Sequence, residues 1–325
     1  MRTMRRVSAV GIACGLIFLF NGCSKETVSP AAKPAVTSQA ADEMVLTPFG
    51  LMEKSKVHFI GEGFQLNVEN GRLQKVETST GRLEEDYGEV KRDIRLQFNQ
   101  GLDASRFSDN RLPAASGWIA YAYWSNSATA NPITYFTTNW VVPSAPTNQG
   151  NQTLFLFNGM QDGTTASSYI IQPVLQWGPS AAGGGKYWAV TNWYVSSSQA
   201  FYGSLVRVSA GAALQGIMQE TAHSGNNYSY KSSFSGYAAA SSLSVSNVPQ
   251  AFWAAETLES YGVNNTSTQY PPNTDIAMTS IEILQGTTNA SIKWTTAQAS
   301  RHAAQKAVVV SNASPGGEVD IYFRQ

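Results

Sequence analysis

The sequence predicts an all-β protein, built as a β-sandwich or barrel of a dozen or more strands. Short runs rich in Val, Ile, Thr, Tyr, Phe and Trp recur from residue 114 to the C-terminus, with Gly, Pro, Asn and Ser between them. The same stretch has only 8 acidic and 7 basic side chains, so Ser, Thr, Asn, Gln and Tyr must supply its polar surface. Helical periodicity is weak, and its best candidate, residues 296–307, fits an irregular loop equally well.

Each predicted strand is a run of four or more such residues that ends at turn-forming residues. In chain order the runs are GWIAYAYW (117–124), ITYFTTNWVVP (133–143), TLFLFNG (153–159), YIIQPVLQWG (169–178), YWAVTNWYV (187–195), SLVRVSAG (204–211), LQGIMQET (214–221), YSYKSSF (228–234), SLSVSN (242–247), AFWAAETLESYG (251–262), AMTSIEIL (277–284), SIKWTT (291–296), AVVVSN (307–312) and EVDIYF (318–323). The SPGG at 314–317 has the turn chemistry to close a final hairpin.

The N-terminus predicts export and lipid anchoring. Residues 1–22 combine a basic start, MRTMRR, with an apolar run too short to span a bilayer comfortably. The run ends in LFNGC, which resembles a bacterial lipobox and implies cleavage before Cys23 and lipidation of that cysteine. The alternative is a plain secretory signal. Cys14 is lost with the signal, so the exported chain cannot form an internal disulfide. We expect a bacterial cell-envelope protein, anchored through Cys23 in the outer membrane or at the cell surface.

Composition divides the exported chain into three parts. Residues 23–45 are rich in Ser, Thr, Ala and Pro and are typical of a flexible tether. Residues 46–113 carry a strong charge run and short alternating runs such as VHFI and FQLNV, which predict a small β-containing segment with turns at ENG and STG. This segment is a pro-segment, a spacer or a strand donor. Residues 114–325 form the predicted sandwich.

Several kinds of site are excluded by residue type. The three histidines, His58, His223 and His302, are far apart and lack zinc-site spacing, so we expect no metal and no cofactor. There is no GxSxG nucleophile elbow, and the GGG at 183–185 predicts a flexible turn, because the rest of a phosphate loop is missing. A formal net charge of zero and the lack of a basic stripe exclude a nucleic-acid partner. We expect a monomer.

Polar side chains inside apolar strands mark the candidate site. Gln176 interrupts PVLQWG, and a buried amide needs partners for two donors and an acceptor. Glu256 and Glu259 lie three residues apart in a strand-like run, and burying either carboxylate unpaired costs several kcal/mol. Strict alternation places the two glutamates on opposite faces of a sheet, and only a β-bulge would bring both to one side. The alternative is that both meet solvent or pair with Arg or Lys.

The order of several motifs resembles the eqolisins, the glutamic peptidases. The matching pieces are NWVVPSAP, TLFLFNGMQDG, YIIQPVLQWG, YWAVTNWYV, SLVRVSAGAALQGIMQET and FWAAETLESYG, within roughly residues 116 to 285. The chain is also similar to a broader set of eqolisin-like secreted proteins that carry QPVLQWG, ETLE-x-Y and PGGEVD-x-Y. The resemblance implies a concanavalin A-like, two-sheet antiparallel β-sandwich of the jelly-roll kind, and an acid-acting endopeptidase.

Carried over residue by residue, VLQWG gives Gln176 the role of the catalytic glutamine, and Ala255-Glu256 nominates Glu256 as the catalytic glutamate. This chain departs from the family in spacing, because Glu259 follows Glu256 after three residues where the family has four, which leaves Glu259 as the alternative. It also has Asn192 where the family has a glutamate. Asn158 or Asp162 stands in for the family aspartate. The candidate substrate-binding residues are Trp177, Trp193, Asn192, Asn158 and Trp253.

The chemistry of a glutamate and glutamine pair is general. A partly desolvated glutamate can take a proton from a water that attacks an amide carbonyl and return it to the leaving amine. The glutamine amide can donate to the oxygen that becomes negative, which is worth roughly 3 kcal/mol in the transition state. A polypeptide is therefore the expected substrate.

Two alternatives remain open. A non-catalytic, lectin-like protein would use Trp177, Trp188, Trp193 and Trp253 to stack on a glycan. A glycoside hydrolase would need two carboxyls about 5 Å apart, and Thr257 and Leu258 supply no additional acid between the glutamates.

Overall fold

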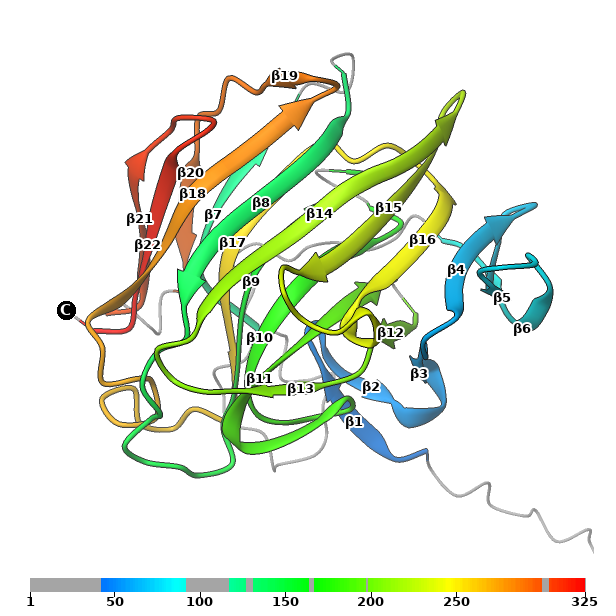
Figure 1. The fold of residues 1–325 in the computed structure, drawn as a ribbon. Coiled ribbons are helices and arrows are strands. Elements are labelled where there is room, and N and C mark those ends of the chain that lie inside the picture. Colours follow the sequence, from blue (N-terminus) through cyan, green and yellow to red (C-terminus); the bar gives the residue numbers. More distant parts are fainter. Residues whose placement is uncertain are drawn as a thin grey trace, which may run out of the picture. The chain divides into compact units, whose positions relative to one another are not determined.

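Strands provide nearly all of the regular structure in the computed structural model (Figure 1). The structure describes residues 42–91, 117–126, 131–163, 167–196, 198–299 and 304–324. The predicted signal 1–22, the lipidation site Cys23, the tether up to residue 41 and residues 92–116 lie outside this description. Among the described residues, no helix has the length and hydrophobicity to cross a membrane.

One of the two large sheets has nine strands, in the order β20-β7-β17-β9-β10-β11-β12-β3, with β13 paired to β11. Its strands are β3 (Val57–Phe59), β7 (Gly117–Ser125), β9 (Thr153–Gln161), β10 (Ile170–Ser180), β11 (Gly183–Val195), β12 (Ala200–Tyr202), β13 (Val206–Val208), β17 (Trp253–Tyr261) and β20 (Thr295–Gln298). The central strands β17, β9 and β10 pair antiparallel, and almost every residue in them is buried.

The second large sheet has eleven strands, in the order β21-β22-β18-β8-β14-β15-β16-β4-β5-β6, with β19 paired to β18. Its strands are β4 (Phe64–Glu69), β5 (Arg72–Glu77), β6 (Leu83–Glu89), β8 (Ile133–Val141), β14 (Ala213–Ser224), β15 (Asn227–Phe234), β16 (Leu243–Val248), β18 (Asp275–Gln285), β19 (Thr288–Asn289), β21 (Lys306–Ser311) and β22 (Gly317–Tyr322). A separate hairpin joins β1 (Met44–Thr47) to β2 (Gly50–Glu53), and short 3-10 turns cover Lys54–Lys56 and Ala239–Ser241.

The core forms because alternate residues of each strand face the other sheet. On β8, Phe136 and Trp140 join the large apolar cluster between the sheets, and on β17 Ala254 and Leu258 do the same. A second, smaller cluster covers the opposite face of the nine-stranded sheet. We call the face of that sheet toward the eleven-stranded sheet its inner face, and the opposite face its outer face. The predicted all-β, two-sheet sandwich is confirmed, and each predicted strand from residue 117 onward contains or overlaps a strand of the structure.

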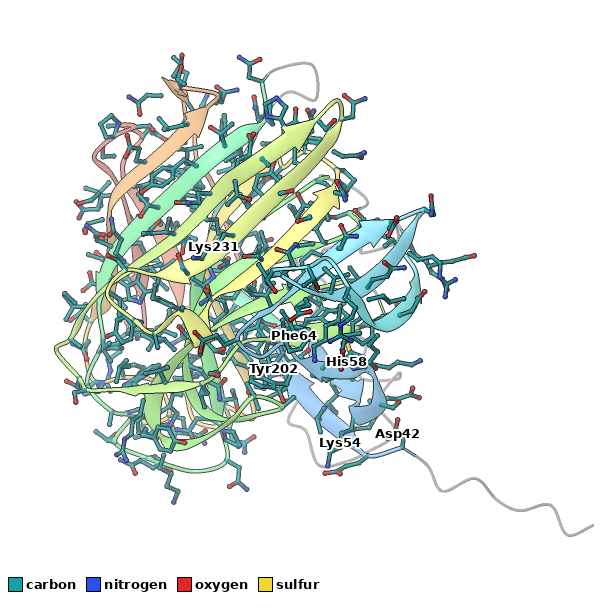
Figure 2. All side chains as sticks on the ribbon, turned by 45° about the vertical axis from the view of Figure 1, so that its right-hand side comes forward. Asp42, Lys54, His58, Phe64, Tyr202 and Lys231 are labelled. Carbon is teal, nitrogen blue, oxygen red and sulfur yellow. The ribbon has the colours of Figure 1, made fainter. Side chains whose placement is uncertain are left out.

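The charged N-terminal segment contributes strands to both sheets. β3 pairs in parallel with β12 at the edge of the nine-stranded sheet, and β4 pairs in parallel with β16 in the eleven-stranded sheet. His58 of β3 stacks on Phe201 of β12, with ring centroids 5.2 Å apart, and Figure 2 labels His58 on β3 and Tyr202 on β12. The VHFI and FQLNV runs thus form strands, as predicted, with turns at ENG and STG.

The predicted C-terminal hairpin is present in the structure. β21 and β22 pair antiparallel around the predicted SPGG turn. The helical alternative for residues 296–307 is wrong where the structure describes it, because β20 extends to Gln298 and β21 begins at Lys306.

Candidate active site

The two glutamates of β17 lie on opposite faces of the nine-stranded sheet. Glu256 alternates with Ala254 and Leu258, which pack between the sheets, so its side chain is on the inner face. Glu259 alternates with Tyr261, which belongs to the outer cluster. The pairing of β17 with β9 is regular throughout, and the one register shift, against β7 at Leu258/Glu259, does not bring both carboxyls to one side.

Glu256 is a carboxyl buried between the two sheets. Its Oε1 accepts a hydrogen bond from the hydroxyl of Thr138 on β8, while Oε2 has no hydrogen-bond partner. Burial raises the pKa of Glu256 well above its usual range, and the Thr138 bond opposes this shift. Because a neutral carboxyl is the form favoured here, Glu256 can act as a hydrogen-bond donor as well as an acceptor.

Two asparagines on the same inner face as Glu256 form hydrogen bonds that tie the two sheets together. Asn158, its partner on β9, has an unpartnered Oδ1 and lies against Gly216 of β14. Asn192 donates from Nδ2 to the Ser241 carbonyl at 2.7 Å and accepts at Oδ1 from the Ser232 hydroxyl at 2.6 Å. Both asparagines are fully buried, so the structure presents neither of these predicted substrate-binding residues to solvent.

Glu259 is equally buried, on the outer face. Its Oε1 accepts a hydrogen bond from the hydroxyl of Tyr261, two residues along the same strand, and its Oε2 has no hydrogen-bond partner. Burial raises the pKa of Glu259 to about 8, and the Tyr261 bond opposes the shift. A carboxyl with such a pKa stays protonated at neutral pH as long as the face remains covered.

Gln176 shares the outer face with Glu259 and closes the β10–β11 turn. Its Nε2 donates to the carbonyls of Gly178 at 2.7 Å and Gly183 at 2.9 Å, and its Oε1 accepts from the Ser180 hydroxyl at 2.8 Å. The GGG at 183–185, predicted to be a flexible turn, instead begins β11 and is closely packed, because a Cβ on Gly184 would lie 2.4 Å from Gln176 Nε2. This explains a glutamine inside an apolar strand, since every hydrogen-bonding group of its amide is satisfied by the turn.

The register aligns Gln176 with Glu259 and separates it from Glu256. Gln176 on β10 and Glu259 on β17 both pair with Phe155 of β9, so the three side chains form one row across the outer face. Strands lie about 4.8 Å apart, which puts the backbones of Gln176 and Glu259 about 10 Å from each other, with Phe155 between them. Glu256 is on the other face. Of the two predicted glutamine and glutamate pairs, only Gln176 and Glu259 share a face of the sheet.

None of the four tryptophans considered for glycan stacking is exposed. Trp177 packs edge to face with Trp188 in the core between the sheets, with ring centroids 5.4 Å apart. Trp193 and Trp253 are on the outer face, and both are at most 1% exposed. The predicted stacking surface is therefore absent from the described part of the chain in this structure.

Part of the outer face is covered by the β1–β2 hairpin. Leu46, Phe49 and Met52 pack against the outer cluster, which includes Phe155 and Tyr261. The hairpin is also held by the backbone, because the N–H of Ala181 in the β10–β11 turn donates to the Leu46 carbonyl at 2.8 Å. The hairpin therefore contacts both the outer cluster and the turn to which Gln176 is bonded.

Comparison with known proteins finds similarity only at the level of solved structures. No family model matches the chain, and no curated protein matches it. Two crystal structures of scytalido-glutamic peptidase with transition-state analogues align at 15% and 16% identity, with TM-scores of 0.41 and 0.36. SCP-B, a member of the eqolisin family of peptidases in a complex with the tripeptide Ala-Ile-His, aligns at 14% identity with a TM-score of 0.37. Each alignment covers 64% of this chain and 98% of the other chain. At these values the likeness carries no argument.

No metal centre accompanies the glutamates among the described residues, and two grooves of the molecule lie elsewhere. No cluster of His, Cys, Asp and Glu there has the arrangement of a metal site. Two shallow grooves lie on the eleven-stranded sheet, one of about 570 Å³ beside Asn139 and Asp275 and one of about 630 Å³ beside Tyr135 and Glu282. Neither groove is lined by Gln176, Glu256 or Glu259.

Sequence reasoning missed the side chains that bond to the candidate residues. Tyr261 could have been found, because a residue two positions after Glu259 in a strand shares its face. Thr138 could not, since it is 118 residues from Glu256 and comes from the other sheet. Asp162, considered as a stand-in for a family aspartate, instead accepts hydrogen bonds from the Ser168 backbone at 2.8 Å and the Ser168 hydroxyl at 2.6 Å.

Proposed function

We propose that the protein is a latent, acid-acting endopeptidase that uses Glu259 and Gln176 on the outer face of the nine-stranded sheet. The observation that carries the proposal is the shared row of Glu259, Phe155 and Gln176, with one carboxyl oxygen of Glu259 unpartnered. The order of the motifs around these residues supports the same reaction. Glu256, on the inner face, is assigned a structural role.

The reaction requires the outer face to open. Once Glu259 is hydrated, its pKa falls from about 8 toward the ordinary value near 4.5, and the carboxylate can take a proton from an attacking water in mild acid. The protonated acid then gives this proton to the leaving amine. Gln176 would donate one amide N–H to the developing oxyanion in place of its bond to Gly183 or Gly178.

The N-terminal segment would keep the enzyme latent. In this proposal residues 46–113 act as a pro-segment, and the hairpin side chains Leu46, Phe49 and Met52 block access to the outer face. The substrate would be a polypeptide, because an extended chain can lie across the face that the hairpin now covers. Water would reach Glu259 at the same time as the substrate.

The test uses a substitution in the full chain that weakens the packing of the β1–β2 hairpin on the outer face. We expect Phe49→Asp to increase cleavage of an unfolded protein at pH 4 to 5 at least tenfold, because a charged side chain cannot stay against the apolar cluster. Met44→Asp is the matched control, because Met44 is on the same hairpin but is 46% exposed. Adding Glu259→Gln to Phe49→Asp should abolish cleavage, and adding Glu256→Gln should not. Cleavage that survives Glu259→Gln would overturn the assignment.

Gln176 needs a separate control because it also holds a turn. Of the bonds made by Gln176, Ser180→Ala removes only the one that Oε1 accepts, and it also removes the bonds of Ser180 Oγ to Ala182 N–H and the Gly183 carbonyl. Gln176→Met keeps these two Ser180 contacts but removes both N–H donors of the amide. In the Phe49→Asp background we expect Ser180→Ala to keep cleavage within a few fold and Gln176→Met to lower kcat by 10²–10³, the usual cost of losing an oxyanion donor. Equal losses of kcat in the two variants would show that Gln176 only holds the turn and does not act in catalysis.

We also propose that the chain is exported and lipid-anchored at Cys23 in a bacterial envelope. The lipobox-like LFNGC supports this, and Cys23 lies outside the described residues. Mass spectrometry of the N-terminal peptide from membranes should find acyl groups on Cys23, and Cys23→Ser should release the protein from the membrane fraction. An unmodified Cys23 would show that residues 1–22 are a plain secretory signal and not a lipoprotein signal.

A further inference from the structure

Gln172 is a buried amide with no hydrogen-bond partner on either atom. It is on β10, 0% exposed, and neither Nε2 nor Oε1 makes a hydrogen bond. This contrasts with Gln176 on the same strand, whose amide is fully bonded to the turn. Buried polar groups in proteins almost always have partners, so an amide that lacks all of them needs an explanation.

The side chain of Gln172 is on the outer face, in the same row as another unpartnered donor. Its neighbours in alternation, Ile170 and Val174, belong to the outer cluster, whereas Ile171 belongs to the core between the sheets. Across the β10–β11 pair, Gln172 is opposite Trp193, whose Nε1 also has no hydrogen-bond partner. The outer face thus offers three N–H donors, two from Gln172 and one from Trp193, and one acceptor, in addition to the free oxygen of Glu259.

We propose that Gln172 is a positioning residue that binds a backbone peptide group of the polypeptide substrate. An amide side chain pairs with a peptide group through one donor and one acceptor, which are the two functions that Gln172 leaves open. Trp193 Nε1 adds a donor for a further carbonyl. This inference rests on the proposed function, because the substrate reaches Gln172 only when the outer face is open.

The spacing predicts where on the substrate Gln172 would act. Gln172 and Gln176 are four residues apart on one face of β10, which is about 13 Å along a strand. An extended peptide has nearly the same rise per residue, so Gln172 would contact the substrate about four residues from the bond that is cleaved. Its contribution should therefore depend on the length of the substrate on that side.

The test compares Gln172→Leu with Gln161→Leu. Gln161 is a buried glutamine on β9 that also faces outward, but its Nε2 donates to the Gly163 carbonyl at 2.5 Å. We expect Gln172→Leu in the full chain to raise Tm by about 2 °C or more, because it removes an unpaired buried amide. Gln161→Leu, which removes a formed bond, should lower Tm.

Cleavage is then measured in the Phe49→Asp background with peptides that extend six or two residues from the cleaved bond on either side. We expect Gln172→Leu to lower kcat/KM about tenfold for the long peptides and to leave the short ones unchanged. A fall in Tm would show that the amide has a structural partner. Equal cleavage of the long peptides by the parent and by Gln172→Leu would show that Gln172 binds a buried water and not the substrate. Either result overturns the inference.

Cleavage by the Phe49→Asp parent tests the proposed function separately from the role of Gln172. If this parent cleaves neither the long nor the short peptides, the proposed function fails, and the positioning role of Gln172 fails with it. If the parent cleaves both and Gln172→Leu changes neither rate, only the role of Gln172 is lost. Met52→Ala, a milder change in the same hairpin contact, replaces Phe49→Asp if that variant does not fold.

Discussion

A buried glutamate has different surroundings on the two faces of the nine-stranded sheet. Glu256 and Glu259 are on one strand and equally buried, and each accepts one bond from a hydroxyl. On the inner face the hydroxyl comes from the opposite sheet, and the surrounding amides bond across the sandwich. On the outer face it comes from the same strand, and a short hairpin provides part of the cover.

This difference separates a structural carboxyl from one that can be uncovered. Exposing Glu256 would require the two sheets to part, which means global unfolding. On the proposed function, exposing Glu259 requires only the displacement of a local element, which can open at a fraction of that free energy. A buried carboxyl with a raised pKa is therefore a better candidate for catalysis on the outer face than on the inner one.

The largest expected effect is a fall in stability as the pH rises. Both carboxyls have folded pKa values above the unfolded value near 4.5, so the folded state binds more protons than the unfolded state above that pH. Their stabilisation is complete below pH 4.5 and is lost as the pH rises toward the folded pKa, which is about 8 for Glu259. Each carboxyl should lower the unfolding free energy by up to about 1.4 kcal/mol per pH unit.

Urea denaturation at pH 4.5, 6 and 7.5 measures this slope. Glu256→Gln and Glu259→Gln keep the shape and remove the titration, so each should flatten the pH dependence and the pair should nearly remove it. If Phe49→Asp uncovers Glu259, as proposed, only Glu256 should still contribute in that background. A wild-type stability that increases over this window would contradict the burial of both groups.

The next largest expected effect is the difference in stability cost between alanine substitutions at two glycines, one on each face. A Cβ on Gly216, between the sheets, would lie 2.5 Å from Asn158 Oδ1 and 2.7 Å from Trp140. A Cβ on Gly159, on the outer face, would meet only side chains, with Ile170 nearest at 3.3 Å. We expect Gly216→Ala to cost about 3 kcal/mol, as overpacking does, and Gly159→Ala to cost less than ~1 kcal/mol. Thermal unfolding measures both, and similar losses would mean that the two faces are equally rigid.

The smallest effect concerns the hydroxyl donors. Thr138→Val and Tyr261→Phe each remove one hydrogen bond to a glutamate, which should cost about 1 to 2 kcal/mol at pH 4.5. Because both bonds hold the pKa of their carboxyl down, each variant should also raise it further. For Tyr261→Phe the pH profile of cleavage should therefore shift upward, while Thr138→Val should leave the profile unchanged. A shift with Thr138→Val would implicate Glu256 in the reaction.

Local pattern was enough to predict the strands and the faces of their side chains. Alternation in FWAAETLESYG placed Glu256 and Glu259 on opposite sides, and the structure has them there. Which face belongs to the core depends on the partner strands, and the partners of β17 begin a hundred residues or more earlier in the chain. The bonding of Gln176 was local but ambiguous, because Ser180 and the glycines that follow could equally have formed a loose loop.

The parallel pairing of the N-terminal strands also has consequences for how the chain folds. β4 is made early in synthesis, but its neighbour β16 follows about 180 residues later, as the pair Leu66 and Val245 shows. Contacts of such long range slow folding, because the loop must close before the contact is gained. Until then β3 and β4 have open edges that can pair with other chains. We therefore expect refolding yield to fall with protein concentration, and holding chaperones to restore it.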